Sequence, residues 1–486
     1  MTSGSRSTVS QLVRERAARD PDGVAFVDAG DGTIMTWAGY DALADRVAAR
    51  YAQQVAVGDR VAIQMAHRGR VHAAYVGFER LGAIVVGIGE RASERETEHL
   101  VAATGATMLL HDVEEQDHTG FATASRPEPD DTALWFLNST SGTTGLPKCV
   151  MHDQARWFAF HDLAQRAARF TPDDVFASLL PAPFGFGMWT AHFTPAIAGR
   201  PCVVLDRFTP EAAIAAIEHH RVSVLAAVST QFIMMLESAA LEDHDLTSLR
   251  VMFTGGEMVP YERALDWERR TGCTVLQFYG SNETGALSGT TLDDPPAIRL
   301  RTAGRVLPEM HVRLLDADTD ADITATGGPG VAACRGPVTC LGYYDDPEAN
   351  AALVTRDGWM KTGDLCTIDA DGVLTVAGRV SDFIIRGGKN LSAAVVEQEV
   401  ATMPGVLLAA AVAKPDPVYG ERVCVFCATE AGTAFSLGDL RAHLAGRGVG
   451  KEHWPEFLVL LDGDLPRSSG GKVAKAELRA RAAALR

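Results

Sequence analysis

Residues 137–148 read Leu137-Asn138-Ser139-Thr140-Ser141-Gly142-Thr143-Thr144-Gly145-Leu146-Pro147-Lys148. They follow the apolar run 133–137, which predicts a buried strand. Small residues behind a strand allow backbone N–H groups to turn toward an anion, and the hydroxyls and the ammonium group of Lys148 add charge-assisted contacts. The stretch therefore predicts a phosphate-binding loop that leaves a sheet edge.

Two other readings of this stretch are less consistent with its residues. It is not a Walker A loop, because no lysine directly follows a glycine and no Ser or Thr follows Lys148. A Ser/Thr/Gly-rich surface linker would have a similar composition. Such linkers seldom begin at an apolar strand and end in a Pro-Lys pair. We therefore expect a nucleotide site of a different family.

Length and composition limit the class of protein. The chain has 486 residues, of which 47% are hydrophobic, so it can form large cores in two or three domains. A net charge of −17 argues against nucleic acid or an anionic membrane as a partner. The first residues show no signal-peptide pattern and no apolar run has membrane-spanning length, so we expect a cytoplasmic protein.

The eight cysteines lack the spacing of a disulfide framework, and we expect free thiols. Cys424 and Cys427 form a C-x-x-C within an alternating apolar run, which favours a strand over a zinc site. Residues 318–322 are rich in aspartate, but they lack the glycine and the terminal glutamate of a calcium loop. We interpret them as a solvated turn.

The first half of the chain alternates helical and strand patterns. A helical pattern over 40–48 precedes a strand pattern over 61–65, and the order repeats at 70–81 with 83–86 and at 210–220 with 222–225. This alternation predicts an α/β fold with a doubly wound parallel sheet.

Four further segments follow the loop in order. They are Tyr279-Gly280-Ser281-Asn282-Glu283-Thr284, Thr362-Gly363-Asp364-Leu365, Gly378-Arg379-Val380-Ser381-Asp382 with Gly387-Gly388-Lys389-Asn390, and Pro466-Arg467-Ser468-Ser469-Gly470-Gly471-Lys472. With these segments the chain resembles the adenylate-forming superfamily of acyl-CoA synthetases, nonribosomal-peptide adenylation domains and luciferases, from about Val24 to Lys475. It looks most like a freestanding acyl- or aryl-CoA ligase.

The resemblance implies two domains. A large N-terminal adenylation core over 1–379 would combine doubly wound sheets with a β-barrel-like subdomain, and a small mobile α+β domain over 380–486 would carry a catalytic lysine. The hinge between them would lie at Ser381, where the family usually has Asp or Lys.

The resemblance also implies an ATP site. The phosphates would be held by Thr140, Ser141, Gly142, Thr143, Thr144, Gly145 and Lys148. The adenine and α-phosphate would lie among Gly255, Gly256, Glu257, Tyr279, Gly280, Ser281 and Asn282, with Asn282 in place of the usual threonine. Asp364, whose two carboxylate oxygens match a vicinal diol, and Arg379 would contact the ribose.

Lys472 and Glu283 are the implied catalytic residues. The lysine would bridge the carboxylate and the α-phosphate, which would otherwise repel each other. Glu283, with Thr143, would hold Mg²⁺. After rotation of the C-terminal domain, a glycine turn would line the tunnel for the pantetheine arm of coenzyme A, with the residues Arg386, Gly387, Gly388 and Lys389.

The acyl pocket would be formed by Phe184, Gly185, Phe186 and Trp189. Amino-acid-activating members of the family carry an aspartate at the position of Gly185, so the pocket favours a non-amino, largely apolar acid and leaves room for a bulky one. The aromatic residues are also typical of an ordinary core, and this alternative stays open.

The sequence thus predicts an AMP-forming acid–thiol ligase that uses ATP and Mg²⁺. It would convert a carboxylic acid to an acyl-adenylate with release of pyrophosphate, and then transfer the acyl group to coenzyme A. One alternative is an acyl-AMP ligase that loads a separate acyl carrier protein, although the charge of −17 disfavours docking of an acidic carrier. Another is a non-catalytic nucleotide-binding relic.

Overall fold

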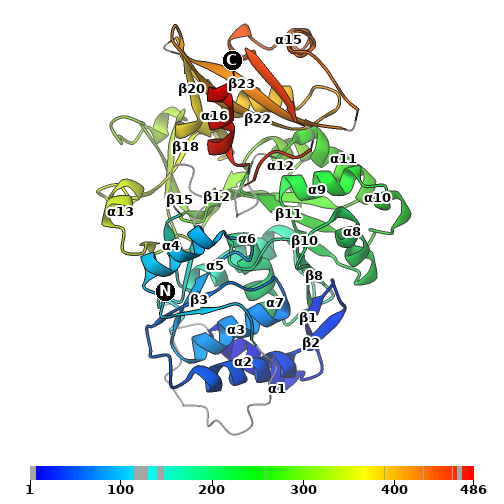
Figure 1. Cartoon of the computed structure of the whole chain (residues 1–486), viewed down its shortest axis with the longest axis vertical. Coiled ribbons are helices and arrows are strands. Elements are labelled where there is room, and N and C mark those ends of the chain that lie inside the picture. Colours follow the sequence, from blue (N-terminus) through cyan, green and yellow to red (C-terminus); the bar gives the residue numbers. More distant parts are fainter. Residues whose placement is uncertain are drawn as a thin grey trace.

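The computed structural model describes residues 7–113, 130–139, 147–257, 259–387, 389–430, 432–461, 463–467 and 473–485, with the backbone only of Ser381 and Asn390. Its described strands form four sheets. Figure 1 shows the chain from residue 383 onward as a separate layer at the top, above a larger body that contains the other three sheets. A large N-terminal domain and a C-terminal domain are therefore present, as the sequence predicts.

The largest sheet has nine strands in the order β14-β13-β12-β11-β10-β8-β9-β1-β2. Its central pairs, from β1–β9 through β11–β12, are parallel, and its edges are antiparallel. The strands are β1 (Val24–Asp28), β2 (Thr33–Thr36), β8 (Phe176–Ser178), β9 (Cys202–Val204), β10 (Val224–Ala226), β11 (Val251–Gly255), β12 (Thr274–Ser281), β13 (Gly285–Gly289) and β14 (Arg305–Val306).

A second sheet has the order β17-β7-β6-β4-β3-β5 and is parallel from β6 to β5. Its strands are β3 (Arg60–Ile63), β4 (Ile84–Gly87), β5 (Met108–Leu110), β6 (Phe136–Ser139), β7 (Cys149–His152) and β17 (Gly342–Tyr343). The parallel strands of both sheets agree with the doubly wound fold that the alternating pattern predicts.

The main hydrophobic core lies between these two sheets. Successive residues of a strand point to opposite faces, so Phe253 of β11 joins the core shared with Phe136 of the second sheet, whereas Met252 joins a second core under α8, α9 and α11. Burial on both faces explains why these strands are almost continuously apolar in sequence.

A third sheet is open and antiparallel, in the order β15-β16-β18-β19. Its strands are β15 (His311–Leu315), β16 (Gly330–Arg335), β18 (Met360–Ile368) and β19 (Leu374–Arg379). The resemblance implies a β-barrel-like subdomain in the N-terminal core, and in the described residues this segment forms a four-stranded sheet that is not a closed barrel. Its buried side packs on residues of α5, β13 and the 303–310 segment.

The C-terminal sheet combines β20 (Phe383–Arg386), β21 (Lys389–Ser392), β22 (Val406–Asp416), β23 (Gly420–Thr429) and β24 (Phe457–Leu461). Cys424 and Cys427 lie in β23, so the strand interpretation of the C-x-x-C is confirmed. All eight cysteines are buried and free.

The helices cover the sheets and bring no membrane-spanning element, since none of the described helices is both long and apolar enough to cross a bilayer. They are α1 (Val9–Arg19), α2 (Trp37–Tyr51), α3 (Gly69–Arg80), α4 (Glu94–Thr104), α5 (Ala155–Ala168), α6 (Gly185–Gly187), η1 (Met188–Phe193), α7 (Thr194–Ala198), α8 (Pro210–His219), α9 (Ser229–Glu237), α10 (Ala240–Asp243), α11 (Tyr261–Thr271), α12 (Pro296–Arg301), η2 (Thr324–Thr326), α13 (Pro347–Leu353), η3 (Val380–Asp382), α14 (Ala393–Val400), α15 (Leu437–Gly446), η4 (Lys451–His453) and α16 (Lys475–Ala484).

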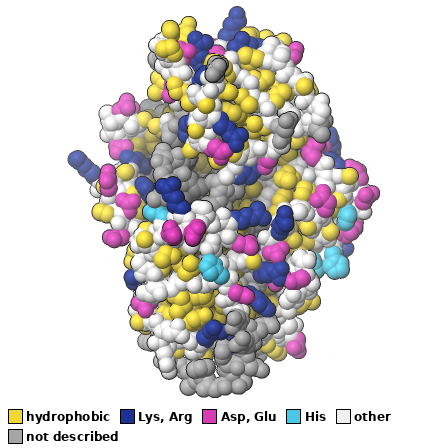
Figure 2. Space-filling view, viewed as in Figure 1, with side chains coloured by type: hydrophobic (Ala, Val, Ile, Leu, Met, Phe, Trp, Pro, Cys, Tyr) yellow, Lys and Arg dark blue, Asp and Glu magenta, His cyan; other side chains and the backbone are white. Residues whose placement is uncertain are grey.

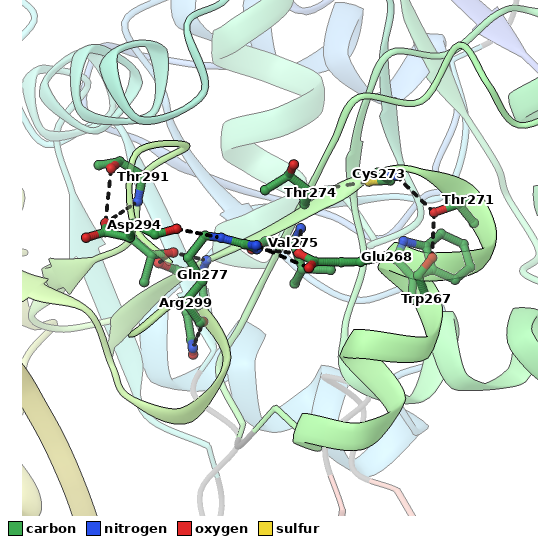
Figure 3. A network of polar contacts seen from close by, with 11 residues as sticks. Trp267, Glu268, Thr271, Cys273, Thr274, Val275, Gln277, Thr291, Asp294 and Arg299 are labelled. Carbon is green, nitrogen blue, oxygen red and sulfur yellow. Dashed lines mark hydrogen bonds and ion pairs between the residues drawn. The ribbon is translucent and has the colours of Figure 1, made fainter. Parts of the chain in front are cut away.

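A buried polar network fixes the start of β12, the strand that contains Tyr279 (Figure 3). Arg299 of α12 donates to the carbonyl of Val275 at 2.9 Å and forms an ion pair with Glu268 of α11. Gln277 donates through Nε2 to the carbonyls of Arg299 at 2.5 Å and Thr302 at 2.7 Å. Because two helices hold the strand, the residues that follow it have a rigid support.

Candidate active site

The predicted phosphate loop connects two paired strands. β6 ends at Ser139 and β7 begins at Cys149, and these two residues lie opposite each other in an antiparallel pair. Residues Thr140, Ser141, Gly142, Thr143, Thr144 and Gly145 lie outside the described residues, so their predicted contacts with phosphate remain predictions. Lys148, at the end of the loop, has its ammonium 5.1 Å from the centre of the Tyr343 ring.

Glu283 and Lys148 both contact Tyr343. The hydroxyl of Tyr343 donates to Oε1 of Glu283 at 2.8 Å. The carbonyl of Glu283 accepts from the backbone N–H of Cys340 at 2.8 Å, which fixes the main chain. The structure thus brings the predicted metal ligand and the predicted polyphosphate lysine to one place. Tyr343 was not predicted.

The predicted ribose residues also meet. Asp364 of β18 lies opposite Arg379 of β19, and Arg379 Nε is 3.7 Å from Asp364 Oδ1. The hydroxyl of Tyr279 donates to Asp364 Oδ2 at 2.8 Å. Burial raises the pKa of Tyr279, and nearby Cys366 and Asp364 raise it further, so the hydroxyl stays protonated and can donate. Arg379 is 50% exposed, which leaves its guanidinium accessible to a ligand.

The predicted adenine walls lie on neighbouring strands. Gly255 ends β11 and is paired with Phe278 of β12, directly before Tyr279. A Cβ atom at Gly255 would lie 2.7 Å from the carbonyl oxygen of Phe278 and 3.1 Å from the ring of Phe186, so the position requires glycine. Gly256 has φ +80°, a left-handed conformation that also favours glycine. Gly280, Ser281 and Glu257 lie in the same two segments.

Asn282 has a different environment from the one the sequence predicts. Its Nδ2 donates to Asn138 Oδ1 at 2.6 Å, and Asn138 Nδ2 contacts both Asn282 Oδ1 at 3.3 Å and the carbonyl of Pro183 at 2.9 Å. The carboxamide is therefore oriented by a second amide on β6. One N–H of Asn282 is used in this pair, and the predicted phosphate contact would depend on the other.

His152 and Arg156 extend this amide pair. His152 Nε2 lies 2.7 Å from Asn138 Oδ1, and Arg156 lies 2.5 Å from His152 Nδ1 and donates to the carbonyl of Asn282 at 3.0 Å. Burial, together with Arg156, holds the pKa of His152 well below its usual value. The neutral ring thus donates through Nε2 and accepts at Nδ1. Because each partner comes from a different element, no sequence spacing could indicate this network.

The aromatic residues of the predicted acyl pocket separate into two groups. Phe184 and Phe186 are half-buried, and Phe186 approaches Gly255 as described above. Trp189, in the π-helix η1, has no exposed surface and packs edge-on against Phe160 and Phe253, with ring centroids 5.0 Å away in each case. Trp189 therefore belongs to the core, which is the alternative that the sequence left open.

The described residues of the glycine turn contact other residues of the C-terminal domain. Arg386 donates to Glu456 at 2.7 Å and to the carbonyl of Glu452 at 2.7 Å, so it stabilises its own domain in this conformation. Gly387 has φ +58°, Lys389 is exposed and Gly388 lies outside the described residues. Whether the turn lines a tunnel for coenzyme A stays a prediction.

Lys472 is likewise outside the described residues, but both neighbouring segments are described. Arg467 and Val473 form an isolated β-bridge, and α16 begins at Lys475. Lys475 Nζ lies 2.8 Å from Glu397 and 3.3 Å from Asp382, and Arg479 lies 2.6 Å from Asp382. We call these four residues the Lys475 cluster. It joins α16 to η3, the short helix that contains Ser381.

A cavity of about 390 Å³ lies beside the Lys475 cluster. Its lining includes Asp382, Glu421 and Arg479, and all of its lining residues belong to the C-terminal domain. It therefore does not coincide with the predicted ATP site. The predicted ATP residues up to Arg379 belong to the larger domain. Figure 2 shows Lys and Arg side chains around the middle of this face, interspersed with Asp and Glu side chains, on a protein of net charge −17.

Comparisons with known proteins identify the family of the chain. Residues 13–129 and 113–344 match the AMP-binding enzyme family, and residues 395–472 match the AMP-binding enzyme C-terminal domain. The chain is 33% identical over 367 residues to a medium-chain fatty-acid–CoA ligase of Escherichia coli, with 75% of the chain and 63% of that protein covered. It is 31% identical to a salicyl-AMP ligase / salicyl-S-ArCP synthetase of Mycobacterium tuberculosis, with 96% and 89% covered.

A solved structure shares the whole fold. ATP-bound MatB from Rhodopseudomonas palustris matches with a TM-score of 0.85 and 26% identity, over 98% of this chain and 99% of that one. The matched region spans 63% and 64% of the first two curated relatives, so their activities are not transferred directly. The extent of the family match is sufficient for one conclusion: the chain belongs to the AMP-binding enzyme family.

Proposed function

We propose that this protein activates a largely apolar, non-amino carboxylic acid with ATP and transfers the acyl group to coenzyme A. In the first step a carboxylate oxygen would attack the α-phosphorus of ATP, and the bond to the β-phosphate oxygen would break to release pyrophosphate. In the second step the thiol sulfur of coenzyme A would attack the acyl carbon, with AMP as the leaving group and the thiol proton lost to solvent.

The observation that carries this proposal is the arrangement of Asp364, Arg379 and Glu283 around the end of β12. Asp364 and Arg379 form an open pair suited to ribose hydroxyls, and Glu283 with Lys148 lies where β7 begins. Carboxylate oxygens are suitable ligands for Mg²⁺, which usually retains waters and phosphate oxygens as its other ligands. When bound, Mg²⁺ would neutralise charge on the polyphosphate, and Glu283 would orient it.

The C-terminal domain would supply the remaining groups. We place the domain boundary after Arg379 and the hinge at Ser381, and we assign Lys472 the role of bringing the acid and the α-phosphate together. After rotation, the turn containing Gly387 and Gly388 would approach the pantetheine arm. Relatives named as CoA ligases, including an indoleacetate–CoA ligase 32% identical over 75% of the chain, support coenzyme A as the acceptor.

A carrier protein is the second candidate acceptor. The relative from M. tuberculosis, which matches nearly the full chain, is named as a salicyl-S-ArCP synthetase. Both acceptors carry a pantetheine thiol, so the first half-reaction would be the same. An assay with free coenzyme A, and separately with an aryl carrier protein, distinguishes them by the product: an acyl-CoA thioester or an acylated carrier.

The test of the first half-reaction is ATP–pyrophosphate exchange with acetate, octanoate, benzoate, a polycyclic acid and phenylalanine. We expect exchange with one or more of octanoate, benzoate and the polycyclic acid. Phenylalanine should fail, because Gly185 offers no carboxylate for its ammonium group and burial of an unpaired cation is costly. Preference for acetate or phenylalanine would contradict the assigned acid class, and absence of exchange with every acid would favour a nucleotide-binding relic.

A further inference from the structure

Tyr343 connects two predicted parts of the ATP site that are distant in sequence. Its hydroxyl donates to Glu283 Oε1 at 2.8 Å, and the face of its ring lies 5.1 Å from the ammonium of Lys148. Glu283 is 60 residues earlier in the chain. The same side chain thus contacts the predicted Mg²⁺ ligand through its hydroxyl and the predicted polyphosphate lysine through its ring.

The backbone of Tyr343 is fixed on both sides. The carboxamide of Asn350, in α13, accepts from the N–H of Tyr343 at 2.7 Å and donates to its carbonyl at 2.8 Å. On the other side, Tyr343 pairs with Val150 of β7, two residues after Lys148. Since a half-buried ring with a fixed backbone has few rotamers, the hydroxyl is held in place rather than only within reach.

The hydroxyl keeps its proton. The unperturbed pKa of a tyrosine hydroxyl is about 10, so the hydroxyl is protonated at neutral pH and can donate. A neutral donor leaves the carboxylate charge unchanged while it fixes one oxygen, so the second oxygen of Glu283 has a defined direction. Groups that hydrogen-bond a metal-ligating carboxylate in this way tune metal affinity.

We propose that Tyr343 is a positioning residue that orients Glu283 toward the Mg²⁺ of bound MgATP and holds Lys148 beside the polyphosphate. The inference rests on the proposed function. The hydroxyl would orient the Mg²⁺ ligand Glu283, and the ring would hold Lys148. Substitutions that remove the hydroxyl alone, or the hydroxyl and the ring together, can therefore separate the two roles.

Tyr343→Phe removes the hydroxyl and keeps the ring. We expect the free Mg²⁺ concentration for half-maximal pyrophosphate exchange to rise about 10-fold, with the KM for the acid unchanged. Tyr343→Leu also removes the ring, and should additionally raise the KM for ATP, because Lys148 loses its aromatic contact. Tyr344→Phe is the matched control: its ring packs in a different apolar cluster, beside Cys149, and we expect wild-type behaviour.

A readout independent of turnover is Mn²⁺ binding measured by electron paramagnetic resonance in the presence of a non-hydrolysable ATP analogue. Weaker Mn²⁺ binding by Tyr343→Phe with an unchanged melting temperature supports the positioning role. A lower melting temperature with unchanged Mg²⁺ and Mn²⁺ affinities would overturn it and leave Tyr343 a structural residue. If the wild-type protein shows no pyrophosphate exchange with any of the tested acids, the proposed function fails. The Mn²⁺ comparison still tests the role of Tyr343 in that case.

Discussion

The candidate ATP site of the large domain and the Lys475 cluster of the C-terminal domain both place carboxylates beside cations, but at different depths. In the ATP site, Arg379 is 50% exposed and lies 3.7 Å from Asp364. In the Lys475 cluster, Lys475 is 19% exposed and lies 2.8 Å from Glu397, which is 17% exposed. In the open, more exposed pair, Arg379 and Asp364 can each contact a ligand in place of the other. In the closed, less exposed Lys475 cluster, the charges neutralise one another and connect α16 to η3 and α14.

This difference predicts that substitutions in the ATP site and in the Lys475 cluster affect different measured properties. In the open site, loss of a side chain should reduce catalysis with little change in stability. In the closed cluster, loss of one partner leaves the others buried and uncompensated, so stability should fall. The predictions below test this contrast, from the largest expected effect to the smallest.

Lys472→Ala should reduce ATP–pyrophosphate exchange by about 10²–10³-fold, or about 3–4 kcal/mol of transition-state stabilisation, because a cation that bridges two anions is lost. The melting temperature should stay unchanged. Exposed Lys451 of η4 provides the control, and Lys451→Ala should exchange normally. Near-normal exchange by Lys472→Ala would remove this lysine from the mechanism.

Lys475→Met should lower the free energy of unfolding by about 3 kcal/mol, because Glu397 would remain buried without its cation and Asp382 would keep its ion pair with Arg479 but lose the one with Lys475. Urea denaturation measures the change. The exposed pair of Lys361 with Asp320 supplies the control, and Lys361→Met should cost less than about 1 kcal/mol. Equal effects of the two substitutions would contradict the distinction between open and closed pairs.

Asn282→Leu should cost about 1–3 kcal/mol of transition-state binding, measured as kcat/KM for ATP, because the carboxamide would no longer reach a phosphate oxygen. It also removes one partner of the buried amide of Asn138, which keeps its contacts with the Pro183 carbonyl and His152. Asn282→Thr restores a hydrogen-bonding group and should retain most activity. An unaffected leucine variant would show that Asn282 serves only the amide pair.

A histidine cluster between α3 and η1 gives stability a pH dependence. Burial lowers the pKa of His67 to about 4 and that of His192 to about 3, while His72 is lowered as well. Below a pH of about 6.5 the unfolded chain binds protons that the folded chain does not, so stability falls as the pH drops from 6.5 toward these values. Each histidine contributes about 1.4 kcal/mol per pH unit.

His192→Gln should therefore lose about 1 kcal/mol less stability than the wild type between pH 7.5 and 5.5, measured by urea denaturation at both values. The other titrating groups are common to the two proteins, but His72, whose Nδ1 lies 3.3 Å from Nδ1 of His192, loses this contact in the variant, so the difference reports on this pair of histidines. An identical pH dependence would mean that His192 has the same pKa in the folded and the unfolded chain, which would contradict the lowered pKa.

The sequence predicts the strands well where they are buried on both faces. The apolar runs of β3, β4 and β10 follow their predicted positions within a few residues, and Asp364 and Arg379 meet because β18 and β19 form a hairpin. The environment of Asn282 was not predictable, because Asn138, His152 and Arg156 reach it through tertiary packing. The π-helical turn that buries the ring of Trp189 in the core was not predictable either, and the contact of Trp189 with an acid stays a prediction.

Gly185→Ala should have the smallest effect and tests the acyl side of the open site. A Cβ atom there would lie 3.6 Å from Trp157 and 3.7 Å from Asn282 Oδ1, which are ordinary contacts, so stability should change by less than about 0.5 kcal/mol. The methyl group should still reduce the exchange rate for a polycyclic acid more than that for octanoate, because it occupies volume beside the predicted pocket. Gly255→Ala is the comparison, since its Cβ would lie 2.7 Å from a carbonyl oxygen and should destabilise the protein. If Gly185→Ala affects all acids equally, residue 185 does not contact the acid.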